Sequence, residues 1–254
     1  MEKKVVFARL TVFLLMIAIL LSFTIACSKK TEQAKKHFDL AIQYEEQKMP
    51  EQAIQEYKKA IQLNPQYAKA HLRLGALYHS LNAFSSALDE YQKVLQINPK
   101  YPGIHTVIAH VYYVRGMTAW VKAMKLDQMA YWQADTSRQL PYRDKAELLD
   151  LIKTYQNDLK SDTTNALTYS KLSQANYILA VDEYQKAITD NPADTSAILY
   201  LALTYSEQGY PQKAMTEYEN LEQVDPRAAG VLKKMFAEKE KEKEYYESLK
   251  KKSR

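Results

Sequence analysis

The chain has 254 residues with only five glycines and eight prolines, a composition that argues against a loop-rich or all-β protein. Its formal net charge of +5 is too small to mark a nucleic-acid-binding surface. The single cysteine, Cys27, excludes an internal disulfide framework.

Residues 1–26 predict a secretory signal peptide. Basic residues come first, an apolar run covers residues 10–25, and Ala26 directly precedes Cys27. A small residue before a lone cysteine at the end of an apolar run resembles the lipobox of bacterial lipoproteins, written here as Thr-Ile-Ala-Cys at residues 24–27. This resemblance implies cleavage before Cys27 and acylation of its thiol, so that acyl chains anchor the protein in a membrane.

The residues around Cys27 also suggest a location. In the lipoprotein family an aspartate after the cysteine retains the protein at the inner membrane. Ser28 therefore implies the periplasmic face of the outer membrane in a two-membrane bacterium. Residues 27–33 would then be the lipidated cysteine and a short linker. The alternatives are that residues 10–25 form an uncleaved transmembrane anchor, or that Cys27 is a buried structural residue.

A repeating pattern organises the chain from residue 34 to residue 228. With Ala34 as position 1 of the first copy and Ala68 as position 1 of the next, large and small residues recur at positions 7, 8, 11, 20, 24 and 27, and proline at position 32. Three stretches fill all seven positions: Leu40, Ala41, Tyr44, Ala53, Tyr57, Ala60 and Pro65; Leu74, Gly75, Tyr78, Ala87, Tyr91, Val94 and Pro99; Leu201, Ala202, Tyr205, Ala214, Tyr218, Leu221 and Pro226.

The spacing of these positions predicts a pair of helices. Positions 7, 8 and 11 share one face of a first helix, and positions 20, 24 and 27 share one face of a second. Small residues at positions 8 and 20 let the two helices approach closely, and the proline ends the second helix.

This order of residues resembles the tetratricopeptide repeat, a helix–turn–helix unit of about 34 residues. Because one helix pair cannot bury its apolar face and stacked pairs can, the resemblance implies an all-α fold, a right-handed α-solenoid of about five repeats. The predicted repeats are residues 34–67, 68–101, 102–164, 165–194 and 195–228. Residues 229–254 are predicted to form a capping helix and a charged tail.

The third and fourth predicted repeats depart from the period. Gly116 occupies the expected turn, but Lys125 stands where the second-helix tyrosine is due, and Tyr155 offers a matching motif 30 residues later. We therefore predict an insertion at about residues 117–144 between the helices of the third repeat. The fourth repeat is shortened, because Tyr155 and Tyr184 are only 29 residues apart. The sequence leaves open whether a tight turn or one fused helix joins its two halves.

The predicted insertion is rich in aromatic residues. They are Trp120, Tyr131, Trp132 and Tyr142. They could form a docking surface for a partner, or they could pack the insertion onto its own solenoid. Catalysis within the insertion is a remote third alternative.

No motif for catalysis or cofactor binding accompanies the repeats. The sequence lacks a glycine-rich phosphate loop, a His-Glu-x-x-His helix and a Gly-x-Ser-x-Gly elbow. His37, His71 and His105 recur at position 4, one repeat apart, so they are predicted to be structural and not to converge on a metal ion. We expect no enzymatic activity, no metal or other cofactor, no small-molecule substrate and no nucleic-acid partner.

In the tetratricopeptide family, positions 2, 5, 9, 12 and 13 of the first helices line a concave groove. Carried over to this chain, these positions hold Lys35, Phe38, Ile42 and Glu45, then Lys69, Leu72, Ala76 and His79, then Thr106, His110 and Tyr113, and finally Leu199 and Leu203. The resemblance implies a mostly apolar groove that binds an amphipathic helix or an extended peptide. Alternatively, Phe38, Ile42 and Leu72 pack between neighbouring repeats.

Together these features predict a non-enzymatic lipoprotein that scaffolds a protein assembly in the cell envelope. It resembles the tetratricopeptide lipoproteins that help to build type IV pili, secretins and other outer-membrane machines. Its partners would be other envelope proteins, bound through a peptide or a helix, while the lipid anchor holds the chain at the membrane. The alternative is a cell-wall adaptor that binds peptidoglycan glycan or positions a wall-modifying enzyme.

Overall fold

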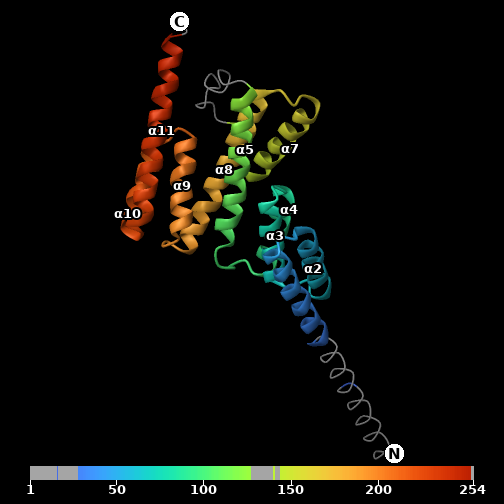
Figure 1. Cartoon of the computed structure of the whole chain (residues 1–254). Helices are drawn as coiled ribbons and strands as arrows, with labels where there is room; N and C mark the ends of the chain where they lie inside the picture. Colours follow the sequence, from blue (N-terminus) through green and yellow to red (C-terminus); the bar gives the residue numbers. More distant parts are fainter. Residues whose placement is uncertain (1–15, 17–27, 127–139, 141–143, 253–254) are drawn as a thin grey trace, which may run out of the picture. The chain divides into compact units, whose positions relative to one another are not determined.

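The computed structural model describes residues 16, 28–126, 140 and 144–252, and side chains as far as residue 241. Every regular element in these ranges is an α-helix, which confirms the predicted all-α class. The chain divides into two compact units between Tyr101 and Pro102 (Figure 1). The right-handed superhelix remains a prediction.

The N-terminal unit contains two complete helix pairs. The first pair consists of the helix at residues 28–46 and α2 (Pro50–Leu63), and the second of α3 (Ala68–Ser80) and α4 (Phe84–Ile97). Residues 28–33, predicted as a linker, are already helical. The core of the first pair is built from the predicted positions, with Ala41, Ala53, Tyr57 and Ala60 fully buried.

Small residues allow the paired helices of this unit to touch. In the second pair, a Cβ added to Gly75 would lie only 2.6 Å from Cε1 of Tyr91. Real Cβ atoms essentially never make such a contact, so a side chain at position 75 would force the ring of Tyr91 to shift from its present place. The close approach inferred from the sequence is therefore real.

The turns and helix ends of the regular repeats follow one geometry. Position 15 holds Lys48, Asn82 and Gly209, all with left-handed backbone at φ values of 58°, 58° and 76°. The second helices end immediately before Asn64, Asn98, Asn191 and Asp225, each of which directly precedes a proline. Each of these four side chains accepts a hydrogen bond from the backbone N–H two residues later, which stabilises the exit from the helix.

The C-terminal unit is built around two long helices. These are α5 (Ile104–Leu126) and α8 (Ala166–Asp190), which pack against each other along their length. Helix α7 (Lys145–Ser161) packs on α8, and α9 (Thr195–Glu207) packs against both long helices. The unit ends with α10 (Pro211–Val224) and α11 (Pro226–Lys252), which pack against each other (Figure 1).

The structure corrects the predicted third and fourth repeats. Helix α8 is continuous, so the tight-turn alternative is wrong, and Gly116 lies inside α5 instead of in a turn. The N-terminal half of α5 pairs with the C-terminal half of α8, because His105 bonds to Glu183 as His37 bonds to Glu56 in the first repeat. Tyr184 therefore fills position 24, which the prediction gave to Tyr155.

Residues 102–194 thus form one repeat with a long insertion. In a regular repeat that starts at residue 102, position 24 would fall at residue 125, whereas here Tyr184 occupies position 24. A repeat lengthened by the difference between residues 125 and 184 ends directly before residue 195. The inserted residues include the second half of α5, all of α7 and the first half of α8. The predicted insertion at 117–144 is therefore too short.

The long helices extend the repeat contact with a period of seven. Small buried residues recur every seven positions, at Ala109, Gly116 and Ala123 on α5 and at Ala166, Ser173 and Ala180 on α8. A Cβ added to Gly116 would lie 2.8 Å from the ring of Tyr177 and 3.3 Å from the carbonyl oxygen of Ser173. The two helices are therefore antiparallel and in close contact beyond the repeat itself.

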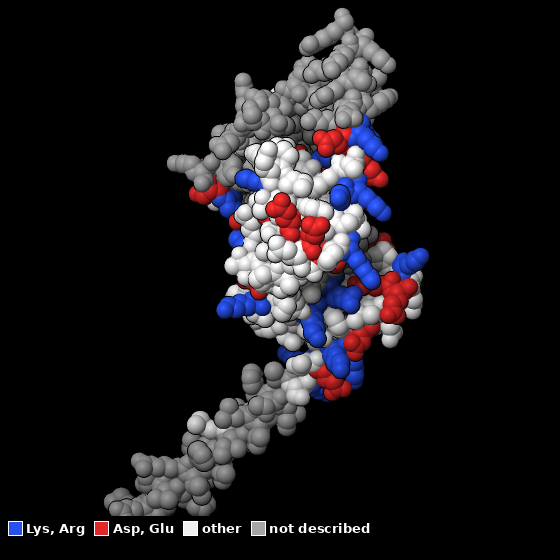
Figure 2. All heavy atoms as spheres, turned by 90° about the vertical axis from the view of Figure 1, so that its left-hand side faces the viewer, with Lys and Arg blue, Asp and Glu red and all other residues white. Residues whose placement is uncertain are grey.

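Helix α11, predicted as a capping helix, packs on α10 and α9. Its residues Ala229 and Leu232 are buried, whereas Val231 and Met235 on the same helix are exposed. Figure 2 shows the side of the molecule on which α10 and α11 lie, where uncharged atoms surround a few acidic side chains.

The contact at Gly116 can be tested by overpacking it. We expect Gly116→Leu to lower the free energy of unfolding by about 2 kcal/mol, because the new side chain has to displace Tyr177. Gly230→Leu on α11 is the control, since a Cβ there has nothing within 4 Å. It should be neutral or stabilising by about 0.5–1 kcal/mol. Urea denaturation followed by circular dichroism measures both; equal effects would show that α5 and α8 do not touch at Gly116.

Candidate functional site

The predicted groove positions of the N-terminal unit form a partly open surface. Lys35, Lys69 and Ala76 are exposed, and Ile42, Glu45, Leu72 and His79 are half-buried. An ion pair joins the two first helices of this unit, because Nη1 of Arg73 lies 3.7 Å from Oε2 of Glu45. The surface combines small and aliphatic side chains with lysines at one end.

Two of these residues pack mainly against neighbouring aromatic side chains and offer little open surface to a ligand. Phe38 is buried, with its ring centroid 5.6 Å from that of Tyr57 and 5.0 Å from that of Tyr67. The His79 ring lies 6.1 Å from the ring of Phe84, and burial lowers the pKa of His79. The open part of the surface therefore centres on Leu72 and Ala76.

The corresponding positions of the C-terminal unit are mostly used to hold α5 against α9. The Thr106 hydroxyl donates a 2.6 Å hydrogen bond to Oδ2 of Asp194, the N-cap residue of α9. His110 and Tyr113 have ring centroids 4.7 and 5.4 Å from that of Tyr200. Burial, helped by the carboxylate of Glu207, raises the pKa of Tyr113. Leu203 is buried and Leu199 half-buried.

A histidine–glutamate pair recurs in each repeat that has histidine at position 4. Nδ1 of His37, His71 and His105 lies 2.6 Å from a carboxylate oxygen of Glu56, Glu90 and Glu183, respectively. Each glutamate directly precedes the tyrosine at position 24. The histidines are thus structural links between paired helices, as expected, but the sequence analysis did not identify their glutamate partners.

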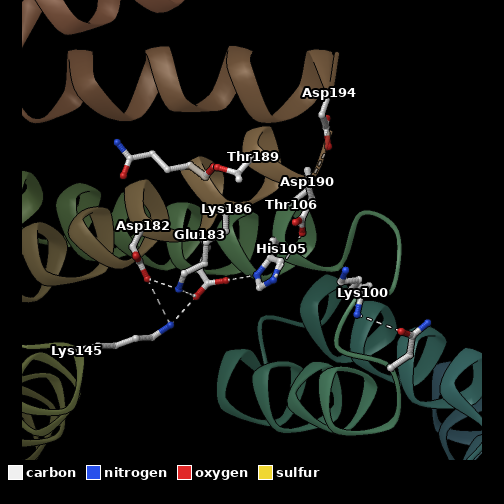
Figure 3. Close-up of polar contacts among 12 residues, drawn as sticks. Lys100, His105, Thr106, Lys145, Asp182, Glu183, Lys186, Thr189, Asp190 and Asp194 are labelled. Atoms are coloured by element: carbon white, nitrogen blue, oxygen red, sulfur yellow. Dashed lines mark hydrogen bonds and ion pairs between the residues drawn. The ribbon is translucent and has the colours of Figure 1, made fainter. Parts of the chain in front are cut away.

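Glu183 has the richest surroundings of the three glutamates. It is almost completely buried and bonds to His105, Lys145 and Lys186, which come from α5, α7 and α8 (Figure 3). Burial acts to raise the pKa of Glu183, but the hydrogen bonds from Lys145 and His105 favour the carboxylate and hold its pKa below the ordinary value of 4.5.

Several predicted site residues lie outside the described residues. They are Cys27, Tyr131, Trp132 and Tyr142. Trp120 is described and is half-buried on α5. The lipidation site and most of the aromatic docking surface therefore stay predictions.

Metal binding and membrane insertion can be compared with the described residues. Among residues 28–126 and 144–241, no cluster of three or more His, Cys, Asp or Glu side chains could hold a metal ion. None of the described helices has both the length and the apolar character needed to cross a bilayer.

The paired helices, their small-residue contacts and their common turn define an α-helical repeat protein. Two family profiles identify the repeat: one described as "TPR repeat" matches residues 42–82, and one described as "Tetratricopeptide repeat" matches residues 68–101. The repeats within residues 42–101 are therefore tetratricopeptide repeats, as the sequence pattern predicted. The helix pairing and the burial of the small residues at positions 8 and 20 continue at residues 102–194 and 195–228, although Tyr218 at position 24 of the last repeat is only half-buried.

Similar solved structures include three bacterial proteins. MamA residues 41-end from Desulfovibrio magneticus RS-1 is 12% identical, with 77% of this chain and 96% of that chain covered and a TM-score of 0.33. TTC0263 from Thermus thermophilus is 17% identical, with 81% of this chain and 97% of that chain covered and a TM-score of 0.37. PilF from Pseudomonas aeruginosa is 19% identical, with 88% of this chain and 93% of that chain covered and a TM-score of 0.32. At these TM-scores the likenesses do not define a function. No curated protein sequence matches this chain significantly.

The buried carboxylate of Glu183 predicts a specific acid sensitivity. Because its pKa is depressed in the folded state, its ionised form contributes stability above about pH 4.5, and this contribution is lost as the pH falls below that value. Glu183→Gln should lower the free energy of unfolding by about 2–3 kcal/mol at pH 7 and by less at pH 3.5.

Thermal unfolding at both pH values gives the comparison. Glu219→Gln, at an exposed position on α10, is the control and should change little at either pH. A Glu183→Gln effect of the same size at pH 7 and pH 3.5 would contradict the stabilising role of the carboxylate.

Proposed function

We propose that this chain is a non-enzymatic interaction scaffold that binds a peptide or a helix of another protein. Tetratricopeptide repeats generally serve protein interaction, and residues 42–101 carry them. The observation that carries the proposal is the open surface on the first helices of the N-terminal unit, where Leu72 is half-buried and Ala76 is exposed. Repeat packing uses the opposite side of α3, where Leu74 and Gly75 are buried.

The chemistry of this surface favours an amphipathic ligand. Ile42 and Leu72 offer aliphatic area that is not fully used by the core, and Ala76 leaves room for an incoming side chain. Lys35 and Lys69 occupy the same repeat position one repeat apart and are both exposed, so they can meet acidic groups of the ligand. An amphipathic helix or extended segment with acidic residues beside an apolar stripe fits these features.

The surface can be blocked without disturbing the fold. Ala76→Arg places a long charged side chain on the exposed position and should reduce recovery of the specific partner at least about ten-fold, as expected for loss of a central contact. Cells carrying the full-length protein would be cross-linked, and the co-purified proteins quantified by mass spectrometry. Gln92→Arg on the exposed side of α4 is the matched control. Equal recovery with both variants would exclude this surface as the binding site.

We further propose that the scaffold is a lipoprotein that acts in assembly of the cell envelope, at the periplasmic face of an outer membrane. The support is the sequence of residues 1–27, namely a basic start, an apolar run and Ala26 before Cys27. The helical start at residue 28 would place the first repeat directly beside the anchor. The resemblance to lipoproteins that build type IV pili and secretins makes such machines the first place to seek partners.

The anchor has its own test. Metabolic labelling with a palmitate analogue should mark the wild-type protein, and Cys27→Ala should lose the label because the acylated thiol is removed. Membrane fractionation follows the location of both forms. An unlabelled wild-type protein that remains in the membrane at full length would contradict lipidation and favour a transmembrane anchor.

A further inference from the structure

Helix α7 is attached to the rest of the unit mainly through α8. Leu148, Ile152, Tyr155 and Leu159 follow one another at spacings of four, three and four along α7, and all four are buried. The Lys171 ammonium of α8 lies 5.9 Å from the ring centroid of Tyr155. One apolar stripe therefore holds the whole length of α7 on α8.

An ion pair fastens the N-terminal end of α7. Lys145, its first residue, donates to Oε1 of Glu183 and has its Nζ 3.6 Å from Oδ2 of Asp182 (Figure 3). The start of the helix is also capped by Asp144, which accepts hydrogen bonds from the backbone N–H groups of Ala146 and Glu147. Because Lys145 meets α8 near its C-terminal end and Tyr155 meets it near Lys171, α7 runs antiparallel to α8.

The repeat does not need Lys145 to complete its own polar contacts. In the first repeat, Glu56 is held by His37 and by Lys59, three residues further along the helix. In α8, Glu183 has the equivalent partners His105 and Lys186. Lys145 is thus an additional cation brought by the insertion. Without it, Glu183 would keep the same set of partners that satisfies Glu56.

We propose that α7 is a strap that covers a helix-binding face of α8, with the Lys145–Glu183 pair as its latch. Leu172, Ala175 and Leu179 are buried and precede Glu183 by eleven, eight and four residues, so they share its side of α8. When α7 leaves, this side accepts an amphipathic helix of the same chemistry, with a cation near its N-terminus and aliphatic residues at successive turns.

This inference deepens the proposed scaffold function by adding a second, concealed binding face and the class of partner that fits it. It rests on the proposal that the chain binds other proteins. Its test is independent of the Leu72 and Ala76 surface, because it concerns other residues in the other unit.

The latch is tested by hydrogen exchange of the full chain. We expect Lys145→Met to speed amide exchange in α7 by about ten-fold, the effect of losing a charge-assisted hydrogen bond. Lys186→Met is the matched control: its side chain is 43% exposed against 44% for Lys145 and contacts the same two carboxylates, but it makes both ion pairs within α8. Lys145→Arg should restore protection. Equal exchange of α7 in the two methionine variants would overturn the latch.

The concealed face is tested with Ile152→Asp, which breaks the apolar stripe of α7. A fluorescent synthetic peptide with the sequence of residues 145–161 should then bind the variant chain, measured by anisotropy, and not the wild-type chain. The same peptide with methionine in place of its first lysine should bind about ten-fold more weakly. Absence of peptide binding, or loss of exchange protection in α8 and α9 of the variant, would show that α7 is an integral part of the core.

Discussion

The close approach of paired helices at two small residues is the constraint on which this structure depends. At Gly75 a single added carbon would enter the ring of Tyr91, and alanine fills the matching positions of the other pairs. Because the helices are so near, a tyrosine on the second helix can fill the space beside the contact and become fully buried. The histidine–glutamate bonds then join the same helices at a second point, and the stacked pairs bury what one pair leaves exposed.

The same constraint explains how one repeat holds an insertion that is longer than a regular repeat. The insertion lengthens both helices and continues the small-residue contact every seven residues, through Gly116 with Ser173. A seven-residue step keeps the same side of each helix facing its partner, so the extension does not twist the repeat helices apart. Helix α7 packs on α8, and α9 still packs against both long helices as the first helix of the next repeat. The repeat pattern survives because the insertion obeys its geometry.

Local signals predicted the regular part of the fold well. Helix ends at Asn-Pro, small residues at positions 8 and 20, and buried tyrosines are determined by backbone and side-chain sterics within a single repeat. The pairing of α5 with α8 depends instead on contacts between residues 78 apart, such as His105 with Glu183. The sequence did contain a clue. Glutamate precedes the tyrosine at residues 57, 91, 184 and 218, whereas threonine precedes Tyr155.

The candidate surface was predictable only in part. Repeat position alone placed Leu72 and Ala76 on an open surface, but it could not show that Phe38, His110 and Tyr113 are drawn into aromatic contacts, because those contacts depend on Tyr67 and Tyr200. The ion pair between Lys145 and Glu183 was also not predictable, because the two residues come together only when α7 packs on α8.

The central claim is that residues 102–194 are one tetratricopeptide-like repeat interrupted by an insertion. Deleting residues 117–175 tests it most directly, because the shortened chain joins Gly116 to Asn176 and restores the period of the regular repeats. Gly116 would then occupy position 15, where Lys48, Asn82 and Gly209 adopt left-handed backbone. The account predicts cooperative thermal unfolding and retained exchange protection in α9 and α10. Loss of cooperative unfolding, or unprotected amides in α9 and α10, would contradict it.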